Sequence, residues 1–323
     1  MKTTPPFAKV KIGSSTMTCD SEWDYIGPGS RPPKNFAFRD IESSEPLELG
    51  DTSWHFHQGI NNFEGDGGIS NYLEAARHFH QGALQGDVEL TKFLGQMYML
   101  GLGVPLDEVE GLRLLTYTAG LGDSDSQFLV GEFLLDQHES FPNRLDGIKW
   151  LLKAAASNDS RAQFMLGECY TNGNGVKVDP RKALAWYRQA AQGDHNLDAI
   201  VKVGICHLSG IGTVIDTVEA RHLFKVAAEL GSPAACFYLG LFHLGGTAPG
   251  AILDEKIAFK WFELGAFGGD ADSVRHLQEC YKKGVGVEKN MRLSNRWANN
   301  YSEYPRITDL EVKLARLRSS MQS

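Results

Sequence analysis

Histidines are the first residues in this chain whose types and spacing could do chemistry. They form two close pairs, His55 and His57 in "WHFHQG" and His78 and His80 in "RHFHQG". Neutral imidazole is a common ligand of zinc and similar ions, so the four suggest a metal site. Residues i and i+2 of a helix point about 200° apart, so neither pair chelates a metal by itself. One histidine of each pair could still meet, but no third ligand is evident. We expect no metal and no cofactor.

A glycine pair in "YTNGNGVKVD", residues 170–179, suggests a second kind of site, a phosphate-binding loop before a helix. The stretch lacks the third glycine of a dinucleotide fingerprint and the GK[ST] of a P-loop. It also recurs, as "GLGV" at 101–104, "GIGT" at 210–213 and "GVGV" at 284–287. We therefore predict that each glycine pair forms a structural turn, in which glycine supplies the positive φ that ends a helix.

The turns belong to a repeat that covers most of the chain. A register point lies six residues before the first glycine of each turn. The series of register points is Gly59, Gly95, Gly131, Gly167, Gly204, Gly240 and Gln278, at intervals of 36 to 38 residues. Seven units therefore run from about residue 54 to residue 304.

Each unit is predicted to be a pair of antiparallel helices. In the fourth unit the first helix spans about 160–171, and the second begins after Asp179, a helix N-cap followed by Pro180 at the first helical position. The same capping position holds Asn71, Asp107, Asn143, Asp216, Asp254 and Asn290. Small residues recur in the first helices, at Ala162, Ala199 and Ala235. We expect large aromatic residues to share one facing position at Phe79, Trp150, Trp186, Phe224, Trp261 and Trp297.

The fourth unit, "RAQFMLGECYTNGNGVKVDPRKALAWYRQAAQGD", resembles the Sel-one-like repeat (SLR) family of the tetratricopeptide-like α/α solenoid superfamily. The resemblance covers about 250 of the 323 residues. It is weaker in the first and last units, and the third unit lacks both turn glycines. It implies an all-α fold: a right-handed α/α superhelical solenoid of about seven helix-pair repeats.

Three regions follow from this pattern. Residues 1–50 contain Pro5, Pro6, Pro28, Pro32 and Pro33 and show no helical period, which predicts an extended or disordered N-terminal arm. Residues 51–304 form the repeat solenoid. Residues 305–323 contain "ITDLEVKLARLRSS", whose Thr308 and Glu311 make a capping box before an apolar face, which predicts a C-terminal capping helix.

Composition excludes several classes of function. A net charge of −8 without a basic tract is unsuited to nucleic acid, which is bound mainly through its phosphates. No apolar run reaches the roughly 18 residues of a membrane span, and the N-terminus lacks the apolar core of a secretion signal. The five cysteines include three that share one register position, Cys169, Cys206 and Cys280. Consecutive repeats hold equivalent atoms on the order of 10 Å apart, beyond disulfide reach. We expect free thiols and a cytoplasmic protein.

The family resemblance implies an adaptor that binds a partner polypeptide in the concave groove of the solenoid, as a helix or as an extended segment. On a helical wheel, two positions of each first helix lie opposite the packing stripe, and they are apolar or acidic. The predicted partner-binding residues are Phe93, Leu129, Glu132, Met165, Glu168, Ile205, Tyr238 and Leu241. The matching partner is an apolar or amphipathic segment with basic residues.

Two alternatives stay open at this point. The apolar groove residues could instead be core, buried against neighbouring units or against the N-terminal arm. The chain could also be an accessory or cryptic hydrolytic subunit of an enzyme complex. No serine elbow, kinase signature, HExxH motif or calcium loop occurs in the sequence, so we predict that it is not an enzyme. His207 and His243 stand where other units have tyrosine, and we expect them to fill the same space.

Overall fold

A computed structural model describes residues 10–12, 15–17, 50–65, 71–136, 144–192, 196–245 and 253–299. The chain divides into two compact structural units, each made of several repeats: the first unit is Met1–Lys177 and the second unit is Val178–Ser323. Two short strands, β1 (Val10–Ile12) and β2 (Ser15–Met17), pair antiparallel, with Val10 opposite Met17. Apart from these strands and Gly50, the predicted N-terminal arm lies outside the described residues, as does all of the predicted capping helix. The three predicted region boundaries therefore stay predictions.

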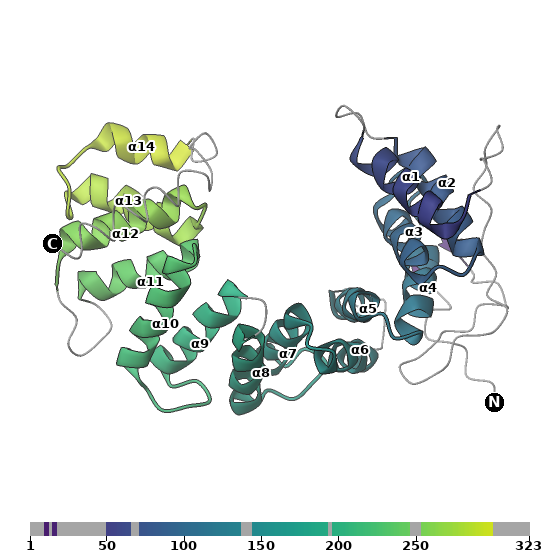
Figure 1. Ribbon diagram of the computed structural model, residues 1–323. Helices are drawn as coiled ribbons and strands as arrows, with labels where there is room; N and C mark the ends of the chain where they lie inside the picture. Colours follow the sequence, from purple (N-terminus) through teal and green to yellow (C-terminus); the bar gives the residue numbers. More distant parts are fainter. Residues whose placement is uncertain are drawn as a thin grey trace. The chain divides into compact units, whose positions relative to one another are not determined.

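Helices form almost all of the regular structure in the described residues (Figure 1). The first unit contains α1 (Thr52–Glu64), α2 (Tyr72–Leu84), α3 (Val88–Leu100), α4 (Glu108–Gly120), α5 (Ser124–Asp136), α6 (Arg144–Ala156) and α7 (Ser160–Asn172). The second contains α8 (Pro180–Gln192), α9 (Leu197–Ser209), α10 (Thr217–Glu229), α11 (Pro233–Leu244), α12 (Glu255–Phe267), α13 (Ala271–Lys283) and α14 (Met291–Asn299). The predicted all-α repeat fold of about seven helix pairs is confirmed.

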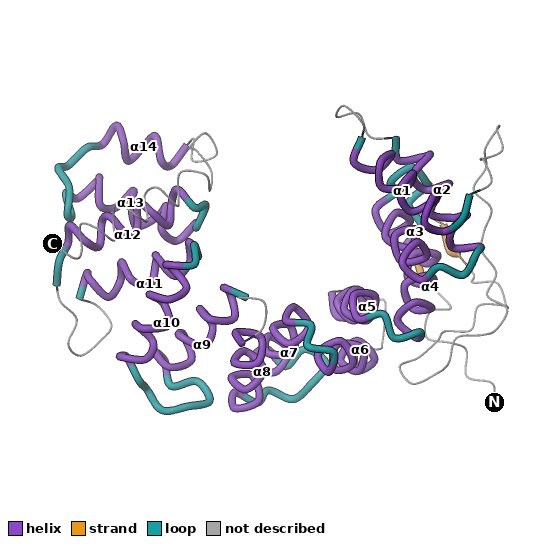
Figure 2. The backbone as a smooth tube through the Cα atoms, in the orientation of Figure 1, coloured by secondary structure: helices purple, strands orange, loops and turns teal. Residues whose placement is uncertain are grey.

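The helix boundaries follow from local capping chemistry. At the start of α4, the Asp107 carboxylate accepts a hydrogen bond from the Glu110 amide at 2.9 Å, and the predicted caps Asn71, Asp216 and Asp254 accept in the same way. These caps satisfy amides that have no partner inside the helix. The predicted cap Asn143 lies outside the described residues. Short loops join most successive helices (Figure 2).

The recurring glycine pair is a structural turn, as the repeat pattern predicts. In the second unit, Gly210 ends α9 with a φ of 72°, and Gly212 follows with a φ of 71°. A methyl group on Gly212 would lie 2.6 Å from the carbonyl carbon of Pro180 and 3.0 Å from the amide nitrogen of Arg181. The turn inside one helix pair, between α9 and α10, therefore packs directly on the first residues of α8, which belongs to the preceding repeat.

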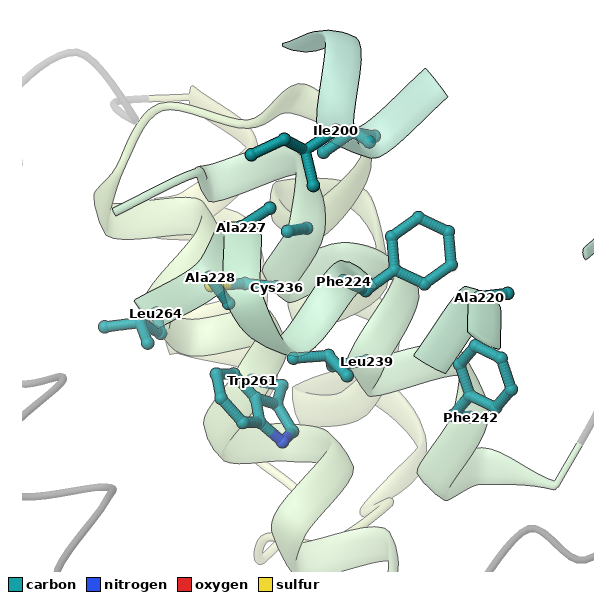
Figure 3. Close-up of a cluster of buried hydrophobic side chains, with 12 residues drawn as sticks. Ile200, Ala220, Phe224, Ala227, Ala228, Cys236, Leu239, Phe242, Trp261 and Leu264 are labelled. Atoms are coloured by element: carbon teal, nitrogen blue, oxygen red, sulfur yellow. The ribbon is translucent and has the colours of Figure 1, made fainter. Parts of the chain in front are cut away.

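Each unit has cores made by residues from successive helices. In the second unit, one core takes Ile200 from α9, Phe224 from α10, Leu239 from α11 and Trp261 from α12 (Figure 3). All four are at most 6% exposed. A helix pair alone could not cover these side chains, so each repeat depends on its neighbours for burial.

The register of the predicted aromatic row is wrong by one residue at two positions. The side chains of Phe79 and Phe224 lie against the register glycines Gly59 and Gly204, where Phe262 lies against Gly240 in the sixth repeat. The four tryptophans of the predicted row stand one residue earlier in their repeats. One residue along a helix rotates a side chain by about 100°, so the two sets occupy different faces. The small register glycines admit the phenylalanine rings.

Two further predictions concern the buried histidines and cysteines. His207 and His243 are each 9% exposed, as is Tyr281, which occupies the same repeat position, so the histidines fill the tyrosine space. Cys169, Cys206, Cys236 and Cys280 are free and buried, as expected. Cys19 lies outside the described residues, and the cytoplasmic location stays a prediction. None of the described helices combines the length and the apolar character that crossing a bilayer requires.

Candidate partner-binding groove

The first unit contains a groove of about 650 Å³ formed by the first helices of three consecutive repeats. Its lining comes from α3, α5 and α7, with Leu115 of α4 and Asn174 of the turn after α7. The lining residues are Gln96, Met99, Leu100, Leu115, Leu129, Glu132, Phe133, Leu135, Met165, Glu168, Cys169, Asn172 and Asn174. We call this set the α3–α5–α7 groove. Its volume is within the range of about 300–1,000 Å³ typical of ligand pockets.

Apolar side chains dominate the groove because the first helices present a second apolar row beside their packing stripe. Leu129 and Phe133 pack partly against the core cluster of Leu112, Leu134 and Trp150 and also line the groove. Leu100 at the groove edge is 67% exposed. When an apolar partner covers apolar surface of this kind, the free energy of the system falls by about 25 cal/mol per Å² of surface buried.

The charged residues of the groove are all acidic. Glu132 of α5 and Glu168 of α7 occupy the same repeat position, one residue after the register glycines, and Gln96 stands there in α3. No lysine or arginine is among the lining residues in the described part of the chain. The Oδ1 atom of Asn174 is buried and has no hydrogen-bond partner among the described residues. The polar groups of the groove therefore favour an occupant that carries N–H donors and positive charge.

The structure brings four of the eight predicted partner-binding residues together in this groove: Leu129, Glu132, Met165 and Glu168. Phe93 lies on α3 but is not a lining residue. Its ring stacks on that of Phe79 with 5.3 Å between the ring centroids.

The other three predicted residues belong to the second unit. Ile205 and Tyr238 pack against the core cluster that contains Phe224, and the Tyr238 ring stacks on Phe224 at 4.5 Å. Burial raises the pKa of Tyr238. Leu241 packs against the last core cluster of the chain. Each is half-buried, and a binding role for these three stays a prediction.

Sequence reasoning missed several of the lining residues. Met99 and Leu135 stand four residues after their register glycines, and Asn172 and Asn174 stand at the end of α7 and in its turn. A helical wheel treats each helix as isolated, so it does not show which residues of neighbouring helices and turns line the same groove. An apolar residue at the same offset in two consecutive repeats was the signal available for Met99 and Leu135.

Ion pairs hold the starts of α3, α5 and α7 together along one edge. The Asp125 carboxylate of α5 forms two ion pairs. Its Oδ2 atom lies 3.4 Å from Nζ of Lys92, and its Oδ1 atom lies 2.6 Å from Nη2 of Arg161. The Arg161 guanidinium also lies over the Phe128 ring, 4.4 Å from its centroid. Burial alone would raise the pKa of Asp125, but the hydrogen bond from Arg161 and the charge of Lys92 lower it overall. These contacts fix the relative positions of the three helices that line the groove.

The histidine pair of the first repeat does meet across the two helices. The Nδ1 atoms of His55 and His78 lie 3.1 Å apart, and the Trp54 ring packs edge-on against both imidazoles. This distance is that of a hydrogen bond, in which one imidazole donates and the other accepts. Within the described ranges no group of three or more metal-binding side chains occurs. Burial lowers the pKa of both histidines, which favours their neutral forms.

The cysteine that lines the groove is not a nucleophile. Burial raises the pKa of the Cys169 thiol to about 11, with a further contribution from the charge of Glu168. Thiolate is the reactive form, and at neutral pH this side chain is almost wholly a thiol. Cys169 therefore acts as a small apolar residue in the groove wall.

The profile of the Sel1 repeat matches this chain seven times, over residues 59–87, 92–123, 124–159, 160–195, 197–232, 233–270 and 279–299. Two solved structures are similar over most of their length. A Sel1 repeat protein from Oxalobacter formigenes is 25% identical with a TM-score of 0.68, and the match covers 78% of this chain and 97% of that one. A protective antigen of uropathogenic Escherichia coli, c5321, which displays an SLR fold, is 24% identical with a TM-score of 0.64 over 84% of this chain and 62% of that one.

Curated relatives match only in part. The rat (Rattus norvegicus) DAP3-binding cell death enhancer 1 is 40% identical over 73 residues, which are 23% of this chain and 14% of that protein. Chitin synthase regulatory factor 3 of Schizosaccharomyces pombe is 30% identical over 108 residues, 33% of this chain and 11% of that protein. The chain thus matches well under two thirds of the length of these relatives.

Proposed function

The chain belongs to the Sel1 repeat family, and we propose that it is a non-enzymatic scaffold that binds a partner polypeptide in the α3–α5–α7 groove. The observation that carries this proposal is the groove itself. Three consecutive repeats expose apolar side chains and two carboxylates to one continuous space of about 650 Å³. A partner that covers these apolar side chains and pairs with the carboxylates binds through apolar burial, and its charge complementarity makes the binding specific.

The names of the relatives support a binding role of this kind. One is described as binding DAP3 and another as a regulatory factor of chitin synthase. Sel1 repeats are protein-interaction modules in general, and the partners of these relatives are not assigned to this chain. Its chemistry follows from the groove: the bound segment is apolar or amphipathic and carries basic residues.

The test combines partner capture with a groove variant. The full chain is used as bait in cell extract of its source, and retained proteins are identified by mass spectrometry. The variant that carries Leu129→Asp and Met165→Asp places two more charges in the groove. We expect the specifically retained partner to be lost, because buried unpaired charge at an interface costs several kcal/mol.

A matched control adds the same charges elsewhere. Val214 and Val218 are 79% and 78% exposed in the second unit, so Val214→Asp with Val218→Asp changes net charge equally without touching the groove. This control should retain the partner. The proposal is wrong if the groove variant keeps its helical circular dichroism and still retains the partner, or if only the control loses it.

Leu129 also touches the core, so a third variant guards against simple unfolding. Glu132→Gln combined with Glu168→Gln removes only charge from half-buried side chains. It should stay folded and weaken retention of the partner, most clearly at low salt.

A further inference from the structure

We propose that α1 is an acid-released cover of the first repeat. When both imidazoles of the His55–His78 pair take up protons, α1 detaches from α2. Its release exposes the aromatic rings of Phe79 and Phe93 as an apolar binding surface. The observations that carry this inference are the hydrogen bond between the two histidines, their burial, and the rings that α1 covers. The inference does not depend on what the α3–α5–α7 groove binds.

The histidine pair joins α1 to α2 at a buried point. His55 of α1 is 2% exposed, His78 of α2 is 5% exposed, and their Nδ1 atoms lie 3.1 Å apart. One Nδ1–H donates to the other Nδ1, so the hydrogen bond requires that one of these two nitrogens carries no proton. The Trp54 ring packs edge-on against both imidazoles, with centroid distances of 5.0 and 5.2 Å, and contributes to their burial.

Protonation of both histidines breaks this contact. All four ring nitrogens then carry hydrogen, so the two Nδ1–H groups would face each other without an acceptor, and two like charges would stand together in a buried place. Released from α2, both imidazoles are hydrated and take up protons at the ordinary histidine pKa of about 6.5. The docked pair keeps its hydrogen bond with one added proton at most. The released state therefore binds more protons, and acid favours it.

The charges that act on the pair come from the same two helices. At the start of α1, the Asp51 carboxylate and a hydrogen bond to the Gly50 carbonyl favour the charged form of the α1 histidine. On α2, Glu74 favours the charged form of the other histidine, whereas Arg77, which pairs with Glu74 at 2.6 Å, opposes it. Desolvation outweighs these effects and lowers the pKa of both histidines, so the docked state favours neutral imidazoles.

Other titratable groups of these helices have different surroundings. His57 of α1 is exposed, and its Nδ1 atom lies 2.7 Å from the Ser53 carbonyl oxygen. His80 of α2 stands two residues beyond the pair, about 200° around the helix.

The third helix that packs in this repeat, α3, also carries charges. Asp87 caps α3, Glu89 is exposed, and Lys92 pairs with Asp125 of α5. Among the described residues, the His55–His78 contact is therefore where protonation acts directly on the docking of α1.

The rings under α1 form one contiguous apolar group. Gly59 of α1 lies directly on Phe79 of α2, because a methyl group on this glycine would overlap the Phe79 ring. The Phe56 ring of α1 lies 6.2 Å from that of Phe93 on α3, and Phe79 stacks on Phe93 at 5.3 Å, both measured between centroids. Detachment of α1 uncovers both stacked rings, and exposed aromatic surface of this kind is what protein partners bind.

The place of α1 in the repeat array makes a local release feasible. It is the first helix of the solenoid and packs on α2 (Figure 1). Opening at the end of a repeat array breaks contacts on fewer sides than opening in its middle, so it costs less free energy. Acid should therefore release α1 while the later repeats stay folded.

Hydrogen–deuterium exchange of the full chain, read by mass spectrometry at about pH 7.5 and about pH 5, tests the release. Protection is corrected for the intrinsic pH dependence of amide exchange. We expect the protection of α1 to fall at least about tenfold at the lower pH, because release takes up one to two protons over about 1.5 pH units below the free histidine pKa. The protection of α9 to α13 should stay within about twofold.

Hydroxyl-radical footprinting measures the exposed surface itself. Phe79 is 1% exposed, so it should be oxidised at about pH 5 and stay protected at about pH 7.5. Phe224 is the matched internal control, because it is 0% exposed and lies against the register glycine Gly204 in the second unit. Its oxidation should stay low at both pH values.

Two variants separate the histidine pair from general effects of acid. His55→Asn combined with His78→Gln replaces both imidazoles by neutral amides that do not titrate. The protection of α1 in this variant should not depend on pH, whatever its level. His57→Gln is the matched control, because it removes an exposed histidine of the same helix outside the pair. It should respond to acid as the original chain does.

The inference is overturned if α1 of the original chain stays protected at about pH 5, if all helices lose protection together, or if Phe79 stays as protected as Phe224. It is also overturned if the double variant keeps the acid response or if His57→Gln removes it. These results do not bear on the groove proposal, because the lining residues of the groove come from α3, α4, α5, α7 and the turn after α7.

Discussion

Replacement of Gly212 by alanine tests the packing between repeats most directly. This residue has a φ of 71°, in the left-handed region, and a methyl group there would meet the backbone of Pro180 and Arg181. Two costs arise. The left-handed conformation of a residue with a side chain costs about 1–2 kcal/mol. The steric conflict adds about 1–3 kcal/mol, because backbone atoms cannot rotate away as a side chain can.

A control in the same unit separates the two costs. Gly231, between α10 and α11, has a φ of 99°, and a methyl group there would have no atom within 4 Å. Gly231→Ala should therefore lower the free energy of unfolding by only the conformational cost, about 1–2 kcal/mol. Gly212→Ala should lower it by about 2–5 kcal/mol, the sum of the two costs.

Urea denaturation followed by helical circular dichroism measures both variants against the original chain. The difference between the two variants, and not either value alone, reports the contact between the turn and α8. Equal losses would show that the turn does not pack on the preceding repeat, and the explanation of the second turn glycine would then be wrong.

Three further predictions concern other parts of the molecule. Burial lowers the pKa of His55 and His78 in the folded chain, so the unfolded chain binds more protons in acid. The free energy of unfolding should be constant above the ordinary histidine pKa of about 6.5 and fall as the pH drops below it. His78→Gln should flatten this part of a plot of the urea midpoint against pH. An unchanged plot would contradict the role of this histidine pair. Burial raises the pKa of Cys236 to about 12, so alkylation mapped by mass spectrometry should modify it only in denaturant, and rapid modification of the native chain would contradict this. Arg161→Ala removes the ion pairs with Asp125 and Asp159 and the stacking on the Phe128 ring, and it should cost about 1 kcal/mol in the urea assay, less at high salt for the ionic part. No loss at low salt would show that these contacts do not position α7.

The periodicity of the sequence determined the fold to a large degree. A glycine, an N-cap and an apolar stripe recurring every 36 to 38 residues gave the helix pairs, their ends and the turns, since each of these is a local effect of backbone conformation and helical spacing. The capping residues Asp107 and Asp216 could be named from sequence for the same reason. The aromatic register at Phe79 and Phe224 could not, because a one-residue offset between repeats is visible only when the facing glycine is known.

The candidate site divides along the same line. Leu129, Glu132, Met165 and Glu168 could be placed on one face of two helices from the sequence, because helical geometry alone sets that face. Only the tertiary structure decided that Asn174 and Leu115 also line the groove, and that Phe93, at an equivalent repeat position, instead stacks on Phe79. Helical periodicity acts within one helix, whereas a groove is the space left between several, and that space depends on side chains contributed by neighbouring repeats.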